Sequence, residues 1–172
     1  MIYPSSIDES GVQAQHPETL VKELAQRKAE DVTQQYPEAW VLGADTVVVM
    51  ENHILGKPAS QKEAAAMLRQ LSNAEHLVYT GFCLACKSLQ QTVLQSVHTR
   101  VQFKALTEAE INWYVATGEP FDKAGGYGIQ GIGAFLVRKI TGSYSNVVGL
   151  PVCEVFETLM DLNIIQLEGT PS

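Results

Sequence analysis

The longest nearly apolar stretch of the chain runs from Trp40 to Met50 and is broken by Asp45 and Thr46. It is far shorter than the roughly 20 apolar residues that a transmembrane helix needs. Its valines favour a buried β-strand. An ionised carboxylate inside such a strand is costly unless it is paired or binds a metal. Asp45 is therefore a candidate functional residue, and the alternative is a carboxylate that caps a turn at the end of the strand.

Helix and strand signals alternate along the chain on both sides of this strand. Apolar patterns predict further strands at 77–86, 93–103 and 135–140. This alternation indicates an α/β or mixed α+β fold. The 172 residues contain no long linker, so we expect a single domain. Prolines and capping residues predict helices from Pro17 to before Pro37, from Ser60 to about Leu71, from Thr107 to Ala116 and from Pro151 to about Leu162.

Composition narrows the class of protein. The chain carries 19 acidic and 12 basic residues, a formal net charge of −7, which argues against a nucleic acid as partner. A small anionic ligand remains compatible, because a few cations in one cleft outweigh a diffuse negative surface locally. The chain has only 3 cysteines and shows neither a secretory signal nor a membrane segment. We therefore expect a cytoplasmic protein without a membrane partner.

Two lysines are candidates for binding such an anion. Lys28 falls on the apolar face of the first predicted helix. The alternative there is a lysine whose stem covers apolar surface while its charge stays in water. Lys57 lies in the tight loop Leu55–Pro58, where glycine and proline restrict the backbone. A solvated loop lysine is the alternative at this position.

A glycine-rich segment at 118–133 is the third candidate. It carries Asp122, Lys123 and Gln130 between its glycines. Clustered glycines let backbone N–H groups approach a ligand closely, and phosphates favour such sites. The segment matches no standard phosphate-binding motif, and a long irregular connection is the alternative. Residue patterns alone thus predict an acidic α/β domain with an anion-binding cleft.

Eight segments together allow a more specific interpretation: Ile7–Glu9, Leu24–Ala29, Leu42–Val48, Leu55–Pro58, Tyr79–Gly81, Gly118–Gly125, Tyr127–Gly131 and Gly142–Pro151. In this order and spacing they resemble the Maf family of nucleotide pyrophosphatases, also called septum formation proteins. The resemblance extends from about residue 7 to residue 162. Each segment is a weak signal by itself, whereas the set is specific.

The resemblance implies a fold and an activity. The fold is α/β, an elongated and two-lobed mixed sheet with flanking helices, similar to inosine triphosphate pyrophosphatases. The family hydrolyses nucleoside triphosphates to the monophosphate and pyrophosphate with a divalent cation, Mg²⁺ or Mn²⁺, and homodimers are common. Members that resemble this chain at Tyr127–Gln130 act on dTTP and UTP, and some of them act on CTP.

The resemblance also implies roles for individual residues. Asp45 matches the family's proton acceptor and, with Glu9, is expected to hold the metal. Hard cations such as Mg²⁺ prefer carboxylate oxygens. Lys57 and Lys28 match polar residues at the nucleotide site and would neutralise charge that develops on the phosphates. Together Asp45, Lys57 and Lys28 form the predicted catalytic set.

Further matching positions concern the substrate. Thr46 and Gln130 match positions tied to substrate choice, and the Gln130 amide could read a pyrimidine edge with its donor and acceptor. Glu9 matches a residue that lines the nucleotide site. Asp122 and Lys123 match the family's glycine-rich loop, and we expect them to contact the substrate.

One part of the family pattern has no match. Family members carry a first strand and a phosphate-binding loop with serines and arginines before the segment that matches Ile7–Glu9. The expectation is a single Maf-like domain over 1–172 that lacks this strand and loop. The alternative function is a catalytically impaired nucleotide-binding or regulatory Maf-like protein that affects septum formation. A related enzyme acting on inosine triphosphate is a third hypothesis.

Overall fold

The computed structural model describes residues 1–7, 16–167 and 169. The strands are β1 (Val41–Met50), β2 (His53–Leu55), β3 (Glu75–Cys86), β4 (Gln91–Phe103) and β5 (Val137–Thr141). The helices are α1 (Pro17–Gln35), α2 (Gln61–Leu71), α3 (Glu108–Ala116), α4 (Tyr144–Val148) and α5 (Val152–Asp161). Three 3₁₀ turns lie between α3 and β5, at Glu119–Asp122, Ala124–Gly126 and Gly131–Leu136.

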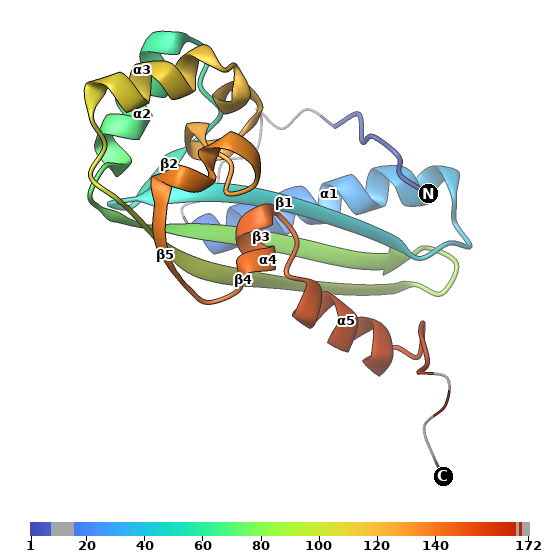
Figure 1. The fold of residues 1–172 in the computed structure, drawn as a ribbon. Coiled ribbons are helices and arrows are strands. Elements are labelled where there is room, and N and C mark those ends of the chain that lie inside the picture. Colours follow the sequence, from blue (N-terminus) through green and yellow to red (C-terminus); the bar gives the residue numbers. More distant parts are fainter. Residues whose placement is uncertain (8–15, 168, 170–172) are drawn as a thin grey trace.

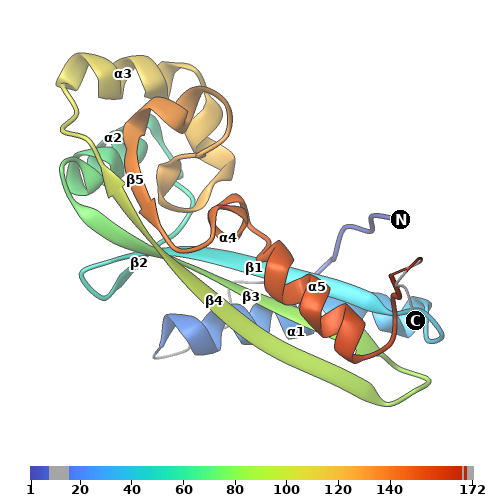
Figure 2. The same ribbon diagram turned by 60° about the horizontal axis from the view of Figure 1, so that its bottom comes forward.

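The molecule is elongated and has two lobes (Figure 1). One lobe consists of the long parts of β1, β3 and β4 with α1 and α5. The other lobe gathers α2, α3, β5 and the 3₁₀ turns at one end of the sheet (Figure 2). The two lobes share the sheet, because β1, β3 and β4 run through both of them.

The described strands form one sheet in the order β2-β1-β3-β4-β5. All four pairings among them are antiparallel, whereas the family resemblance implied a mixed sheet. The long strands β3 and β4 form an antiparallel hairpin. They are adjacent in the sequence, so a short turn is enough to connect them. β2 pairs with β1 only between Val48 and Met50. Among the described strands, β1 is therefore an edge strand at Asp45.

Helix α1 lies directly against one face of the sheet. Its Val21, Ala25 and Ala29 are completely buried on β1 and β3. The contact requires a glycine in β3, because a Cβ at Gly81 would lie 2.4 Å from the carbonyl carbon and oxygen of Val21. Gly81 pairs with Asp45 across the sheet. The same close contact therefore fixes the distance between α1 and the sheet beside Asp45.

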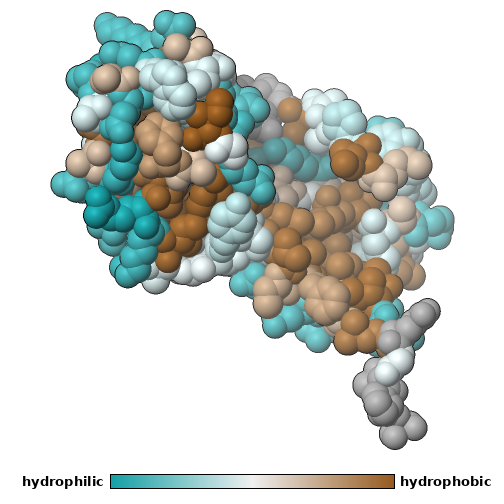
Figure 3. Space-filling view, viewed as in Figure 1, coloured by the Kyte–Doolittle hydropathy of each residue, from teal (hydrophilic) through white to brown (hydrophobic). Residues whose placement is uncertain are grey.

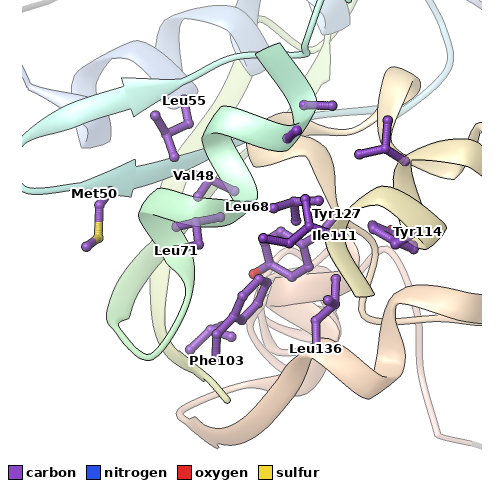
Figure 4. Packing of buried hydrophobic residues seen from close by; sticks show 14 of the residues in the cluster. Val48, Met50, Leu55, Leu68, Leu71, Phe103, Ile111, Tyr114, Tyr127 and Leu136 are labelled. Atoms are coloured by element: carbon purple, nitrogen blue, oxygen red, sulfur yellow. The ribbon is translucent and has the colours of Figure 1, made fainter. Parts of the chain in front are cut away.

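The second lobe holds the largest apolar core (Figure 4). The rings of Phe103 and Tyr127 meet edge to face, with centroids 4.7 Å apart. Each fully buried leucine or phenylalanine of such a core contributes about 1.5–3 kcal/mol relative to an exposed one. This core anchors the glycine-rich segment, because Tyr127 belongs to it. Its larger side chains are Val48, Met50, Leu55, Leu68, Leu71, Phe103, Ile111, Tyr114, Tyr127 and Leu136.

The predicted α/β class with flanking helices is confirmed. Each predicted helix and strand is present, and the capping box of Thr107 and Glu110 is formed as expected. The patterns did not predict β2 and α4, which have only 3 and 5 residues. No helix in the described part of the chain is long and apolar enough to cross a membrane.

Candidate active site

A cleft of about 410 Å³ opens where the two lobes meet. Its lining comes from β1, from the loop after β2, from the glycine-rich segment and from the α4 region. Six of the predicted site residues line this one cleft: Asp45, Thr46, Lys57, Asp122, Lys123 and Gln130. These residues come from three separate segments of the sequence, which the fold brings together as the family resemblance implies.

Asp45 and Thr46 are neighbours in β1 whose side chains leave opposite faces of the strand. The Asp45 carboxylate faces α1, where Lys28 Nζ donates a hydrogen bond to Asp45 Oδ1 at 2.6 Å. Both side chains are largely buried, with 11% of Asp45 and 22% of Lys28 exposed. The open edge of β1 lets Asp45 line the cleft as well. Lys28 itself does not line the cleft, and its charge is paired with Asp45 in the cleft wall.

Thr46 belongs to a polar network below the cleft. Its hydroxyl lies 2.9 Å from the hydroxyl of Thr80, which donates to the backbone carbonyl of Asn146 at 3.0 Å. The fully buried Asn146 amide donates to Val78 O and to Thr99 Oγ1. This network fastens α4 to the sheet. It thereby holds Val147, Val148 and Gly149 in the cleft wall.

Lys57 and Lys123 supply positive charge to the cleft from two loops. Lys57 is exposed and follows β2. Lys123 Nζ donates to Asp122 Oδ1 at 2.6 Å. The hydrogen bond from Lys123 lowers the pKa of the Asp122 carboxyl below its usual value. The cleft thus combines two carboxylates with lysines, although the net charge of the whole chain is −7.

Gln130 is the last residue of the glycine-rich segment that lines the cleft. It is exposed, and its amide makes no side-chain hydrogen bond with the part of the chain that the structure describes. Tyr127 anchors the same segment, because its hydroxyl lies 2.7 Å from His76 Nε2 in the core. Burial raises the pKa of Tyr127 and lowers the pKa of His76 to about 4. Both groups are therefore neutral at pH 7. Because the Gln130 side chain is exposed, its amide is available to a ligand.

The expected metal ligands are only partly within the described residues. Glu9 lies outside them, and among residues 1–7, 16–167 and 169 no three histidine, cysteine, aspartate or glutamate side chains cluster to hold an ion. Mg²⁺, however, usually binds to one or two carboxylates together with water and substrate phosphates. Asp45 in the cleft wall fits such a metal, which would arrive with the nucleotide.

Comparison with known proteins decides the family. The family model described as Maf-like protein matches residues 1–162. The chain belongs to the Maf family.

Several curated relatives of this Maf-family chain have the same name, dTTP/UTP pyrophosphatase. A dTTP/UTP pyrophosphatase of Syntrophus aciditrophicus is 48% identical over 168 residues, which cover 98% of this chain and 82% of the relative. The dTTP/UTP pyrophosphatase of Desulfotalea psychrophila is 47% identical and covers 94% of this chain and 83% of its own length. A Geobacillus protein of the same name is 52% identical over 88% of this chain and 80% of its own length.

Several residues that support the cleft walls from behind had no signal in the sequence. The α4 wall lies in the segment 142–151, which is part of the family resemblance but gave no helix signal. Asn146 is the buried centre of that segment, and its long-range hydrogen bonds leave no trace in sequence spacing. Glu119 and Tyr114, which brace the glycine-rich segment, were also missed.

Proposed function

We propose that this Maf-family chain hydrolyses dTTP and UTP to the nucleoside monophosphate and pyrophosphate. The observation that carries the proposal is the single cleft lined by Asp45, Lys57, Lys123 and Gln130. Relatives named dTTP/UTP pyrophosphatase, identical to the chain at about half of the aligned positions, support the same substrates.

The reaction needs an activated water, charge neutralisation and a leaving group. In our proposal Asp45 accepts a proton from the water that attacks the α-phosphorus. The bond from the α-phosphorus to the oxygen that bridges to the β-phosphorus breaks, and pyrophosphate leaves. Lys28 holds the Asp45 carboxylate in place through their 2.6 Å contact.

Charge on the phosphates is neutralised by lysines. Lys57 and Lys123 line the cleft from two different loops, where they would stabilise negative charge that grows on the transferring and leaving oxygens. A bound Mg²⁺ or Mn²⁺ would supply further charge neutralisation beside Asp45. Gln130 would bind the pyrimidine edge, and Thr46 would support the wall that faces the substrate.

The first experiment is pyrophosphate release from dTTP, UTP, CTP, ITP and 7-methyl-GTP with Mg²⁺ or Mn²⁺. We expect turnover of dTTP and UTP that stops when a chelator removes the metal. Preference for ITP would instead favour the inosine triphosphate hypothesis. Nucleotide-induced thermal stabilisation without any turnover would favour the nucleotide-binding or regulatory alternative.

We also propose that the chain forms a homodimer and works in the cytoplasm. Val152 and Phe156 of α5 are exposed apolar side chains, and apolar surface gathers over this helix (Figure 3), which supports self-association. Light scattering after size-exclusion chromatography would measure the mass, and a monomer of 18.8 kDa at micromolar concentration would contradict the dimer. Three free cysteines and a nucleotide substrate support the cytoplasm, which cell fractionation would test.

A further inference from the structure

The segment from Gly128 to Gly133 forms a tight loop that carries Gln130 near its tip. Its two ends touch, because a Cβ at Gly133 would lie 2.3 Å from the carbonyl oxygen of Gly128. Gly133 is buried and Gln130 is exposed. The position of the Gln130 amide in the cleft therefore depends on how the two ends of this loop are held.

Glu119 holds the Gly133 end of the loop, and Tyr114 links Glu119 to the Gly128 end. Glu119 Oε1 accepts the backbone N–H of Gly133 at 2.9 Å, and Glu119 Oε2 accepts that of Ile132 at 3.0 Å. The hydroxyl of Tyr114 donates to Glu119 Oε1 at 2.9 Å. The same hydroxyl accepts the backbone N–H of Gly128 at 3.2 Å. Glu119 and Tyr114 thus form a brace that spans the loop on either side of Gln130.

The brace needs an ionised carboxylate. Burial alone would raise the pKa of Glu119, but the N–H groups of Gly133 and Ile132, the Tyr114 hydroxyl and nearby Lys123 lower it overall. A carboxylate accepts through both oxygens and donates nothing. An amide at this position would turn an N–H donor toward another donor, so one of the three hydrogen bonds would be lost.

Recognition of the hydrogen-bonding edge of a base depends on the position and orientation of the Gln130 amide. A uracil or thymine ring presents an N–H donor beside a carbonyl acceptor, whereas adenine presents a ring-nitrogen acceptor beside an amino donor. An amide can turn to satisfy either pattern. Discrimination therefore requires that the loop keep the amide at one distance and one angle from the base.

We propose that Glu119 and Tyr114 are positioning residues for nucleotide selection, which hold the Gly128–Gly133 loop so that Gln130 favours a pyrimidine base. The inference rests on the proposed function for the contact between Gln130 and the base. Neither Glu119 nor Tyr114 lines the cleft, so both act through the loop. Their loss should affect the choice between bases more than the chemistry at the phosphates.

The test compares Glu119→Gln and Tyr114→Phe with a matched control, Glu108→Gln. Glu108 lies on the same lobe at the start of α3 and is ion-paired with the exposed Arg69. The readout is the ratio of kcat/KM for UTP to kcat/KM for ATP. We expect this ratio to fall about tenfold in both variants, mainly through a higher KM for UTP, and to stay unchanged in the control.

The ratio separates positioning from mere stability. A variant that only unfolds in part lowers the active fraction for all substrates equally, so its ratio does not move. An unchanged ratio in both variants, with or without a lower melting temperature, would overturn the inference.

A second readout does not depend on turnover. Isothermal titration would measure the affinities of UMP and AMP for the folded wild type and variants. If the wild type releases no pyrophosphate but prefers UMP, and Glu119→Gln loses this preference, the proposed hydrolysis fails while the inference holds. If the wild type does not distinguish UMP from AMP, or if Glu119→Gln keeps the wild-type preference, the inference fails.

Discussion

Asp45 lies where the open edge of β1 meets the cleft, and its carboxylate is paired with Lys28. The change Asp45→Asn keeps the size of the side chain and an acceptor for Lys28 but removes the base. We expect turnover of dTTP to fall at least about 10²-fold, in the range of general-base effects. Pyrophosphate release and a melting curve would measure activity and folding. Asp161→Asn, at the exposed end of α5, is the control, and full activity of Asp45→Asn would refute the base assignment.

Lys57 supplies an exposed charge in a loop whose backbone is restricted by its neighbours Gly56 and Pro58. The change Lys57→Met keeps an apolar stem and removes the charge. Loss of one such electrostatic contact to the transition state lowers kcat by about 10²–10³. We expect a reduction at the lower end of this range for dTTP, measured by initial rates. The control Lys62→Met removes an exposed charge from α2, and equal losses in both variants would contradict a specific role.

At the scale of elements, the contact between α1 and β3 decides whether Lys28 reaches Asp45. The change Gly81→Ala adds a Cβ that would lie 2.4 Å from the Val21 backbone, so α1 has to move away from the sheet. Overpacking of this kind costs about 1–3 kcal/mol of unfolding free energy. Urea denaturation would measure it. Gly56→Ala is the matched control, because a Cβ there meets nothing within 4 Å, and equal stability of the two variants would contradict this account.

Elements with local signals were predictable from the sequence, and elements without them were not. The capping box at Thr107 and Glu110 marked the start of α3, because its hydrogen bonds join residues close in the chain. The strand β2 has only 3 residues and is stabilised by its pairing with β1. So short a strand has no apolar periodicity from which it could be predicted. Short elements of this kind depend on tertiary contacts.

The same distinction applies to the candidate site. Asp45 was conspicuous because it interrupts an apolar strand. For its partner Lys28 the pattern alone left open a lysine whose stem merely covers apolar surface, because their contact joins two elements across 17 positions of sequence. Glu119 had no signal in the sequence, and the fold shows that it accepts hydrogen bonds from Tyr114, Ile132 and Gly133.

At the scale of the whole molecule, the two lobes meet along a shared sheet, and the core of one lobe supports the wall of the cleft. Tyr127 is buried in that core and also lines the cleft. Its hydroxyl contacts the buried His76, whose ring packs against Phe103. Stability of the core and geometry of the cleft are therefore coupled through the same side chains.

This coupling predicts how the stability of the molecule depends on pH. His76 is 2% exposed, and burial lowers its pKa to about 4 from 6.5. Between these values the unfolded chain binds a proton that the folded chain does not, so the free energy of unfolding falls as the pH falls. The loss from this one group between pH 7.5 and pH 5 is about 2 kcal/mol, and it levels off below pH 4.

The change His76→Gln removes the titrating ring and leaves an amide within reach of Tyr127. Its overall stability is expected to be lower at pH 7.5, because the packing against Phe103 is lost. The decisive quantity is the further loss on going to pH 5, measured by urea denaturation at both pH values. We expect that loss to be about 2 kcal/mol smaller than in the wild type. The control His53→Gln changes an exposed histidine in β2, and an identical pH dependence of His76→Gln and wild type would show that His76 does not link the core to pH.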